Sequence, residues 1–363
     1  MKKLFRRGLV VGKFCPLHLG HEFLIRSALD QCQELVVLSY TKPGFAGYES
    51  ERRAAWLRVR FPDVDSHVLD DAILAGTCAA RGLAPREVPG DAASDAAHRH
   101  FVAWWLEEVR GVLVDAVFTS EDYGDGFANV IAACSGTPVQ HVCIDKARTA
   151  VSVSGTQVRA NPYEWRAYLS PQVYASFVPR VALLGGESTG KSTLAQALAS
   201  ALGTAWVPEY GRELWEEKAG LLAIEDMLLI GQTQIQREER LAYEVEGVLV
   251  CDTTPLTTSL YSEVLFGAVA PDLQSLARRP YDLVLLCAPD FPFVQDGTRR
   301  DEAFRLFQHG WYIRSLARDG VPYVVLAGTP DERLASALAA IRVKWPRRVA
   351  SSAQPAAERL VAR

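Results

Sequence analysis

Short apolar runs alternate with helical patterns along most of this chain. In the first half, apolar runs typical of strands fall at 8–14, 34–40, 66–70, 113–120 and 139–144. Patterns with helical periodicity lie between them, at 19–31, 49–60 and 98–110. This rhythm is typical of a parallel sheet whose strands are joined by helices. The stretch 71–97 is rich in Ala, Gly, Pro and Asp, and we expect a mobile or partly helical insertion there.

A second α/β pattern begins at Arg180, after a stretch that contains three prolines. Its apolar runs fall at 180–185, 204–207, 248–252, 281–288 and 322–327. The sequence therefore predicts an α/β protein with two domains, 1–160 and 180–345, joined by linker helices at 161–179 and followed by a tail at 346–363. A length of 363 residues agrees with two domains, since one core of that size would be unusual.

Composition removes several classes of protein. With 49% hydrophobic and 23% charged residues, the chain is not of the disordered class. A formal net charge of −4 does not favour general binding of nucleic acid or a membrane surface, so anions must be bound in local pockets. The seven cysteines are scattered, and the first residues lack the apolar core of a secretory signal. We expect a cytoplasmic protein with reduced thiols and no membrane contact. The composition does not decide whether the chain forms a homo-oligomer.

A phosphate-binding loop is the strongest motif. Residues 185–192 read GGESTGKS, which fits G-x-x-x-x-G-K-[ST] between an apolar run and a helical pattern. In such loops Lys191 would reach the outer phosphates of ATP, and the Ser192 hydroxyl would bind Mg²⁺. The alternative is a chance glycine turn. The residues expected to contact the nucleotide are Gly185, Gly186, Glu187, Ser188, Thr189, Gly190, Ser192 and Thr193.

Two further elements of the second half fit phosphoryl transfer. Asp252 follows an apolar run, where a metal-binding carboxylate is expected, although an Asp at that point can also cap the next helix. Arg299 and Arg300 precede a helical pattern and suit the cations of a lid over ATP. A solvated charged helix start is the alternative for this pair.

The first half carries a histidine loop directly after its first apolar run. Residues 12–21 read GKFCPLHLGH, in which His18 and His21, with Lys13 beside them, can bind a polyphosphate at the start of a helix. Gly12, Phe14 and Gly20 belong to the same expected nucleotide site. Cys15 and the two histidines also have a spacing that zinc could use, but no fourth ligand is evident nearby.

Hydroxyl and guanidinium groups follow the last strand predicted for the first domain. The sequence SGTQVR places Ser154, Thr156 and Arg159 there, and these groups suit the outer phosphates of ATP. Alone this motif is weak, because Ser and Thr also cap helices. Together with H-x-G-H in one α/β domain it is specific.

These motifs resemble known families. The H-x-G-H loop with SGTQVR resembles the nucleotidyltransferase superfamily that includes nicotinamide mononucleotide (NMN) adenylyltransferases, and GGESTGKST with EYGRE, CDTT and DGTRR resembles ribosylnicotinamide kinases. Their order over residues 8–343 is that of the bifunctional NadR-type family. The resemblance implies a Rossmann-like nucleotidyltransferase domain followed by a P-loop kinase domain. Some members carry an N-terminal helix-turn-helix; only seven residues precede the first predicted strand here, and we do not expect DNA binding.

The resemblance implies two reactions of small molecules. In the first, the phosphate of NMN attacks the α-phosphorus of ATP to give NAD and pyrophosphate, and His18, His21, Lys13 and Arg159 would stabilise the negative charge together with Mg²⁺. In the second, the 5′-hydroxyl of nicotinamide riboside accepts the γ-phosphate of ATP. Glu209 or Asp252 would accept the hydroxyl proton, and the choice between them is open.

Contacts to the substrates are less well defined. Glu209, Tyr210 and Arg212 resemble family positions that face the riboside, although charges at a helix start are often merely solvated. A pyridinium ring favours an aromatic face, for which Trp104 and Trp105 are candidates in the first domain, with core packing as the alternative. Tyr210, Trp215 and Trp311 are candidates in the second. Two rival functions remain: an adenylyltransferase and kinase for another vitamin-derived substrate, or a nucleotide-gated regulator with little turnover.

Overall fold

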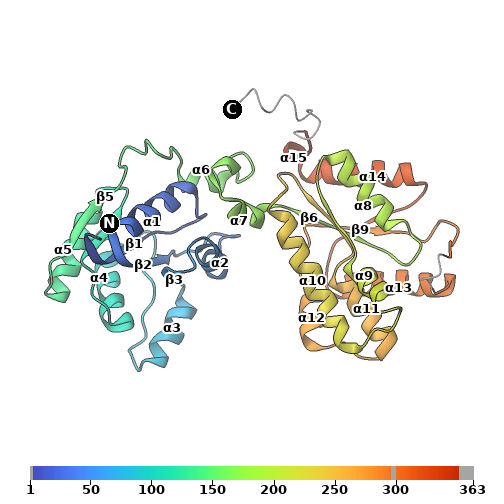
Figure 1. Ribbon diagram of the computed structural model, residues 1–363, viewed down its shortest axis with the longest axis horizontal. Helices are drawn as coiled ribbons and strands as arrows, with labels where there is room; N and C mark the ends of the chain where they lie inside the picture. The colour runs from blue at the N-terminus through green and yellow to red at the C-terminus, as the bar shows by residue number, and fades with distance from the viewer. Residues whose placement is uncertain (1–2, 296–299, 351–363) are drawn as a thin grey trace. The chain divides into compact units, whose positions relative to one another are not determined.

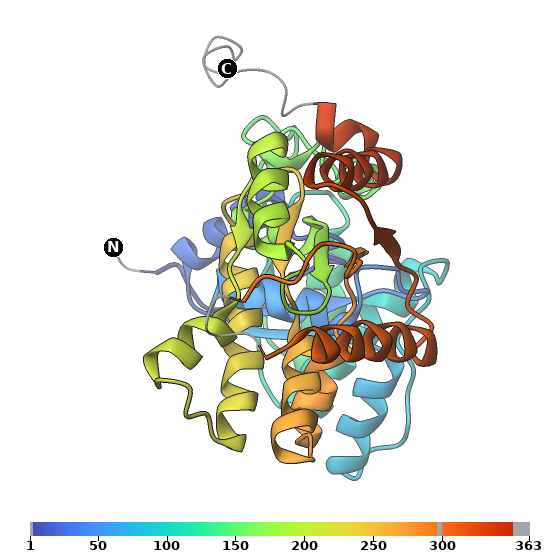
Figure 2. The same ribbon diagram turned by 90° about the vertical axis from the view of Figure 1, so that its right-hand side faces the viewer.

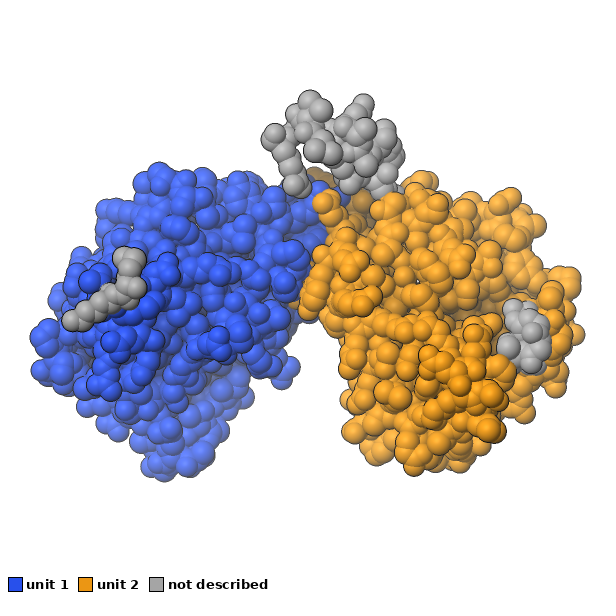
Figure 3. Space-filling view, viewed as in Figure 1, with its two compact units in different colours: residues 1–174 blue, residues 175–363 orange. Residues whose placement is uncertain are grey.

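The computed structural model describes residues 3–295 and 300–350. The chain forms two compact units, Met1–Tyr174 and Ala175–Arg363, which Figure 3 colours separately. Each unit has its own parallel β-sheet with helices packed against it (Figure 1). The predicted α/β class with two nucleotide-binding types of domain is confirmed. Within the described residues no helix has both the length and the apolar character needed to cross a membrane.

The first unit is built on five parallel strands in the order β3-β2-β1-β4-β5. Their bounds are β1 (Phe5–Val11), β2 (Cys32–Tyr40), β3 (Asp65–Leu69), β4 (Ala116–Thr119) and β5 (Gln140–Cys143). The chain order reverses on either side of β1, so the crevice at the carboxyl ends of β1 and β4 is where ligands bind in such sheets.

The helices of the first unit connect these strands and continue to its end. They are α1 (Leu19–Gln31), α2 (Ser50–Arg60), α3 (Asp71–Ala80), α4 (Asp95–Trp104), the π-helix η1 (Trp105–Arg110), α5 (Gly124–Ser135), α6 (Gly155–Ala160), the 3₁₀-helix η2 (Arg166–Tyr168) and α7 (Pro171–Tyr174). The region expected as an insertion is therefore partly helical, because α3 occupies its first third.

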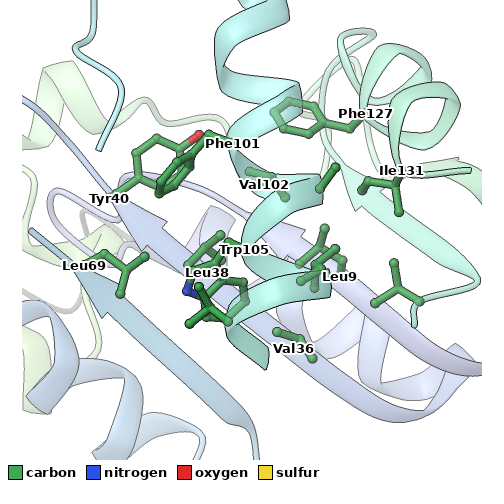
Figure 4. Packing of buried hydrophobic residues seen from close by; sticks show 14 of the residues in the cluster. Leu9, Val36, Leu38, Tyr40, Leu69, Phe101, Val102, Trp105, Phe127 and Ile131 are labelled. Carbon is green, nitrogen blue, oxygen red and sulfur yellow. The ribbon is translucent and has the colours of Figure 1, made fainter. Parts of the chain in front are cut away.

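The central strands of the first unit are buried on both faces, and successive side chains pack on alternate faces. Leu9, Val36 and Leu38 face a cluster that α4, η1 and α5 complete, and Figure 4 shows Trp105 packed among them. Trp105 is only 1% exposed. The helix therefore holds the sheet through a large apolar contact, and Trp105 belongs to the core.

The second unit has five parallel strands in the order β10-β9-β6-β8-β7. They are β6 (Arg180–Leu184), β7 (Trp206–Val207), β8 (Leu249–Asp252), β9 (Leu283–Cys287) and β10 (Val324–Leu326). Its helices are η3 (Ala175–Phe177), α8 (Lys191–Leu202), α9 (Tyr210–Glu217), α10 (Ile224–Ala242), α11 (Pro255–Phe266), α12 (Pro271–Ala277), α13 (Glu302–Arg318), α14 (Pro330–Lys344) and α15 (Pro346–Ala350). Figure 2 shows β10 leading into α14 (red).

Both faces of the second sheet are covered. Val181 and Leu183 of β6 pack with α8 and α14, whereas the alternate residues Ala182 and Leu184 pack with α11 and α13. This two-sided burial explains why the strands of this half are nearly continuous apolar runs. It also fixes the carboxyl end of β6, from which the phosphate loop emerges.

The observed elements differ from the predicted ones mainly at their ends. The first strand, expected at 8–14, is Phe5–Val11, because the chain turns at Gly12 and Phe14 has a positive φ of 50°. The helix expected at 98–110 begins at Asp95, where Ser94 caps it, and continues as a π-helix after Trp104. The predicted tail at 346–363 begins with the short helix α15.

Candidate active sites

The phosphate loop follows β6 and depends on its glycines. Gly185 has φ of 148°, and a Cβ there would lie 2.9 Å from the carbonyl oxygen of Cys287. At Gly186 a Cβ would lie 2.8 Å from the carbonyl oxygen of Arg305. Gly190 has φ of 76° and directly precedes α8. A side chain at these positions would force the loop or its neighbours to move, so the motif residues are required by the backbone path.

Side chains hold the loop in shape. Thr189 Oγ1 donates to the carbonyl oxygen of Gly186 (2.7 Å), and Lys191 Nζ donates to the same oxygen (2.9 Å). The buried guanidinium of Arg333 donates to the carbonyl oxygen of Thr189 (2.9 Å). These bonds occupy the carbonyl oxygens of Gly186 and Thr189. The loop amides at the start of α8 suit an anion, which would draw the Lys191 ammonium away from Gly186.

Ser192 and Asp252 lie together at the carboxyl ends of neighbouring strands. Asp252 pairs in register with Leu183, two residues before the loop, and Ser192 donates a hydrogen bond to its carboxylate. Asp252 is 1% exposed, and its Oδ1 has no hydrogen-bond partner. Thr254, not Asp252, caps α11. The capping alternative for Asp252 is therefore wrong, and its unpaired buried oxygen beside a hydroxyl fits a hard divalent cation.

The carboxyl group of Glu209 does not cap the helix that it precedes. The residue occupies the N-cap position of α9 but its side chain makes no capping bond. Burial raises its pKa, while the charges of Lys191 and Arg212 oppose that rise. Burial likewise raises the pKa of Asp252, again against Lys191. Two carboxyl groups thus surround the Lys191 ammonium, and a carboxylate with a raised pKa is the better proton acceptor.

A cavity joins Lys191, Ser192 and Glu209. Its lining includes loop residues 187–193 together with Glu209, Arg212, Trp215, Leu222, Met227, Ile230, Thr257, Tyr261, Leu265, Arg300 and Gln308. The apolar part of this wall comes mainly from α9, α10 and the segment between them. The polar part comes from the loop, α11 and the start of α13.

Not every residue predicted for the second site lines this cavity. Tyr210 faces elsewhere: the guanidinium of Arg237 lies 4.6 Å from its ring centre. Trp311 donates to Glu263 Oε2 at the surface (3.0 Å), which leaves Trp215 as the tryptophan that faces the cavity. Arg300 lines the cavity, and Arg299 lies outside the described residues.

In the first unit the two histidines begin helix α1. His18 is the N-cap, and its Nδ1 accepts from the backbone N–H groups of Gly20 (3.2 Å) and His21 (3.4 Å). In return, the N–H of His18 donates to His21 Nδ1 (3.4 Å). The rings stack with centres 3.6 Å apart. A Cβ at Gly20 would lie 3.1 Å from the His18 ring, so the glycine leaves room for this arrangement.

These contacts fix the protonation state of both rings. Because each Nδ1 accepts a hydrogen bond, a neutral ring must carry its proton on Nε2. Burial, followed by the charges of Arg148 and Arg159, lowers the pKa of His18 to about 4. Burial and the neighbouring His18 lower the pKa of His21 well below its ordinary value. At neutral pH both imidazoles are therefore uncharged and carry their proton on Nε2. A hydrogen bond from the His21 ring to the backbone of Pro16 opposes the lowering of the His21 pKa.

The cations predicted for this site are partly engaged. Arg159 Nη1 donates to the carbonyl oxygen of Cys15 (2.7 Å), which ties α6 to the histidine loop. Lys13 Nζ pairs with Asp91 Oδ2 at 2.8 Å, a partner from the 71–97 region. The sequence missed Arg148, whose charge acts on both histidines. It lies six residues before Ser154, the first residue of SGTQVR, and no local pattern marks it.

The hydroxyl groups of SGTQVR serve the local fold in this structure. Ser154 caps α6, and Gln157 completes the capping box. Thr156 Oγ1 accepts from Arg159 Nη2 (3.0 Å). For the zinc alternative, the described residues contain no group of three or more His, Cys, Asp or Glu side chains arranged to hold a metal.

The two tryptophans of the first unit have different surroundings. Trp105 lies in the core, so the alternative of core packing holds for it and it has no face for a substrate. Trp104 is partly buried, and the guanidinium of Arg86 lies 4.3 Å from its ring centre. A pyridinium stacking on that side of Trp104 would have to displace Arg86.

Comparisons with known proteins agree with this description. The family model described as "AAA domain" matches residues 180–333. The "Trifunctional NAD biosynthesis/regulator protein NadR" of Escherichia coli (strain K12) is 29% identical over 318 residues, which are 80% of this chain and 71% of that protein. The protein of the same description from Salmonella typhimurium is 29% identical over 314 residues, with the same coverage.

Two solved structures share the fold over nearly the whole chain. A "NadR protein in complex with NR" has a TM-score of 0.67 at 21% identity and covers 96% of this chain and 98% of its own. A "NadR protein in complex with NAD and AMP-PNP" has a TM-score of 0.65 at 21% identity, covering 94% and 98%. The resemblance to NadR-type proteins seen in the motifs is confirmed.

Proposed function

We propose that this chain, whose homologues are NadR proteins, makes NAD in two steps. The second unit phosphorylates nicotinamide riboside to NMN with ATP. The first unit transfers the adenylyl group of a second ATP to NMN. The observation that carries the proposal is that each unit gathers groups able to bind an anion at the start of a helix, neutral imidazoles and arginines in the first and a glycine loop and a lysine in the second.

The first unit is suited to a reaction that needs no general base. The phosphate of NMN is already an anion near neutral pH, so the site has to align two anions and stabilise the charge that builds up on the departing pyrophosphate. His18 and His21 donate through Nε2 without losing or gaining a proton. Arg148 and Arg159 supply positive charge beside them. Neutral imidazole donors of lowered pKa are an established way to stabilise a developing oxyanion.

The second unit is suited to phosphoryl transfer to a neutral hydroxyl. Lys191 would bind the outer phosphates of ATP, and Glu209, with its raised pKa, would accept the proton of the 5′-hydroxyl. Ser192 and Asp252 are the residues that would hold Mg²⁺, and their donor set fits it. When bound, Mg²⁺ neutralises phosphate charge. Arg212 and Arg300 line the cavity as further cations.

Two substitutions test the assignment of one reaction to each unit. Lys191→Ala should abolish phosphorylation of nicotinamide riboside and leave formation of NAD from NMN nearly unchanged. His21→Ala should do the reverse. The measurement is incubation of each purified variant with ATP, Mg²⁺ and either riboside or NMN, with products resolved by mass.

The contrary outcomes are specific. Loss of both activities from either substitution would argue against separate sites. A wild-type protein that binds ATP but forms neither product would favour the nucleotide-gated regulator. Turnover of a different vitamin-derived substrate, with none of the riboside, would favour the other enzyme reading.

A further inference from the structure

The side chain of Glu187 does not behave as a nucleotide ligand, although Glu187 belongs to the phosphate loop. Glu187 lines the cavity, as do both residues that bind its carboxylate. Oε1 accepts from the hydroxyl of Tyr261 (2.8 Å), and Oε2 accepts from the backbone N–H of Arg300 (2.8 Å). A carboxylate beside a triphosphate would repel it. A position turned toward the cavity instead suits a ligand that donates hydrogen bonds.

A closed ring of hydrogen bonds fixes this carboxylate. Tyr261 donates to Glu187 and accepts from Gln308 Nε2 (3.0 Å). Gln308 Oε1 in turn accepts from the backbone N–H of Glu187 (2.8 Å). Gln308 is only 1% exposed, so this ring of hydrogen bonds is anchored by a buried side chain of α13. The loop, α11 and α13 therefore hold the Glu187 carboxylate in one orientation.

The lining of the cavity sets the direction in which a riboside can bind. Its 5′-hydroxyl has to reach the phosphate loop and Glu209, because phosphoryl transfer occurs there. The flat ring then lies toward the apolar wall formed by Leu222, Met227 and Ile230. The sugar lies between the two, beside the loop. Glu187 lines the same cavity, and so do Tyr261 and Arg300, which hold its carboxylate; this places the carboxylate beside the space that the sugar would occupy.

We propose that the Glu187 carboxylate accepts hydrogen bonds from the ribose hydroxyl groups of the kinase substrate and thereby selects ribosides over 2′-deoxyribosides. This inference rests on the proposed kinase function of the second unit. A carboxylate has about four acceptor positions, of which Tyr261 and Arg300 use two. The other two match the adjacent 2′- and 3′-hydroxyls of a ribose, which carboxylates bind in other nucleotide sites.

The first test needs no mutation. Wild-type protein is assayed with ATP, Mg²⁺ and either nicotinamide riboside or its 2′-deoxy analogue. Loss of one hydrogen bond to a charged acceptor should lower kcat/KM for the deoxyriboside by roughly 10- to 100-fold. Equal kcat/KM for the two substrates would overturn the inference. No phosphorylation of either one, with ATP bound, would instead count against the proposed kinase function itself.

The second test assigns the discrimination to Glu187. Glu187→Gln weakens the bonds to both hydroxyls of the riboside but only the 3′-hydroxyl bond of the deoxyriboside. The ratio of kcat/KM for the riboside to that for the deoxyriboside should therefore fall by roughly 10- to 100-fold, so that the variant no longer discriminates. Tyr261→Phe keeps the carboxylate but removes its lock, and should reduce the discrimination in part. Glu263→Gln makes the same chemical change at an exposed position on α11 and should alter neither substrate.

A structural role for Glu187 would give a different result. If the carboxylate only supports the loop, Glu187→Gln lowers kcat/KM for both substrates by the same factor and weakens binding of the non-hydrolysable ATP analogue AMP-PNP. That result would overturn the inference. Unchanged affinity for AMP-PNP, combined with a selective loss on the riboside, would support it.

Discussion

His18 caps α1 and, in the proposed function, donates to the phosphates through Nε2; two near-isosteric substitutions can separate these two roles. Its Nδ1 caps α1, and its Nε2–H points away from that cap. In His18→Asn the amide oxygen can keep the cap, but no donor remains at the Nε2 position. In His18→Gln the amide nitrogen can reach the Nε2 position, but the cap is lost. The first variant should lose activity and keep its fold, and the second should lose stability and keep more activity.

The structure gives the size of each effect. Removal of one preorganised donor to a developing oxyanion lowers kcat by about 10²–10³-fold, which is expected for His18→Asn in NAD formation from NMN. Loss of a helix cap costs about 1 kcal/mol, which is expected for His18→Gln. The kinase activity of the same protein is the internal control and should not change in either variant.

The lowered pKa of His18 adds a dependence on pH with a defined sign. The folded chain keeps this ring neutral down to about pH 4, whereas the unfolded chain protonates it below its ordinary value of 6.5. Between these values the unfolded state binds more protons, so stability rises with pH and levels off above 6.5. At about 1.4 kcal/mol per pH unit, the window is worth roughly 3 kcal/mol.

Hydrogen exchange of the α1 and β1 amides measures this effect in the first unit alone. The free energy of opening in the wild type minus that in His18→Asn should increase by roughly 3 kcal/mol from pH 4 to 6.5 and then stay constant. His100→Asn replaces an exposed histidine and is the matched control. A difference that is flat with pH, or equal loss of activity in the Asn and Gln variants, would refute the assignment of one role to each nitrogen.

Two further predictions concern the second unit. Gly186→Ala should lower kinase activity and cost about 1–3 kcal/mol of stability, because the new Cβ would contact the carbonyl oxygen of Arg305. Gly76→Ala is the control, since no atom lies within 4 Å of its new Cβ. Equal effects of the two substitutions would contradict the close approach at Gly186. Glu238 is fully buried and accepts from the Tyr281 hydroxyl, and burial raises its pKa to about 7. The folded chain therefore keeps this proton to a higher pH than the unfolded chain, so the wild type loses stability as pH rises from 4.5 to 7. Over that range the stability of Glu238→Gln, measured by urea unfolding, should gain up to about 3 kcal/mol relative to the wild type. A difference between the two proteins that stays constant with pH would contradict the raised pKa of Glu238.

The sequence located the residues whose role depends on a short stretch of chain. The glycines of the phosphate loop, Lys191 and the two histidines occupy fixed spacings because one turn of backbone must present amides or rings at a helix start. Asp252 could be placed at a strand end for the same reason. The sequence did not show whether Asp252 or Thr254 caps the next helix, because that depends on the backbone geometry at its start; in the structure Thr254 is the cap.

Residues brought together from distant elements could not be assigned in this way. Arg148 acts on the histidines from another loop, and Arg333 holds the phosphate loop from α14. Trp104 and Trp105 are adjacent in a helical pattern, and only the packing of η1 on the sheet shows which one is buried. Tyr210 and Trp215 are both aromatic residues of α9, but only Trp215 lines the cavity.

The start of α1 explains why histidine, and not a more common capping residue, stands at this position. Aspartate would satisfy the same two amides, but it would put a negative charge where the triphosphate has to approach. Serine would cap without charge, yet it has no second donor aimed outward. An imidazole held neutral does both tasks with one side chain, so exchanging His18 for either residue would give a chain that folds yet no longer attracts its nucleotide.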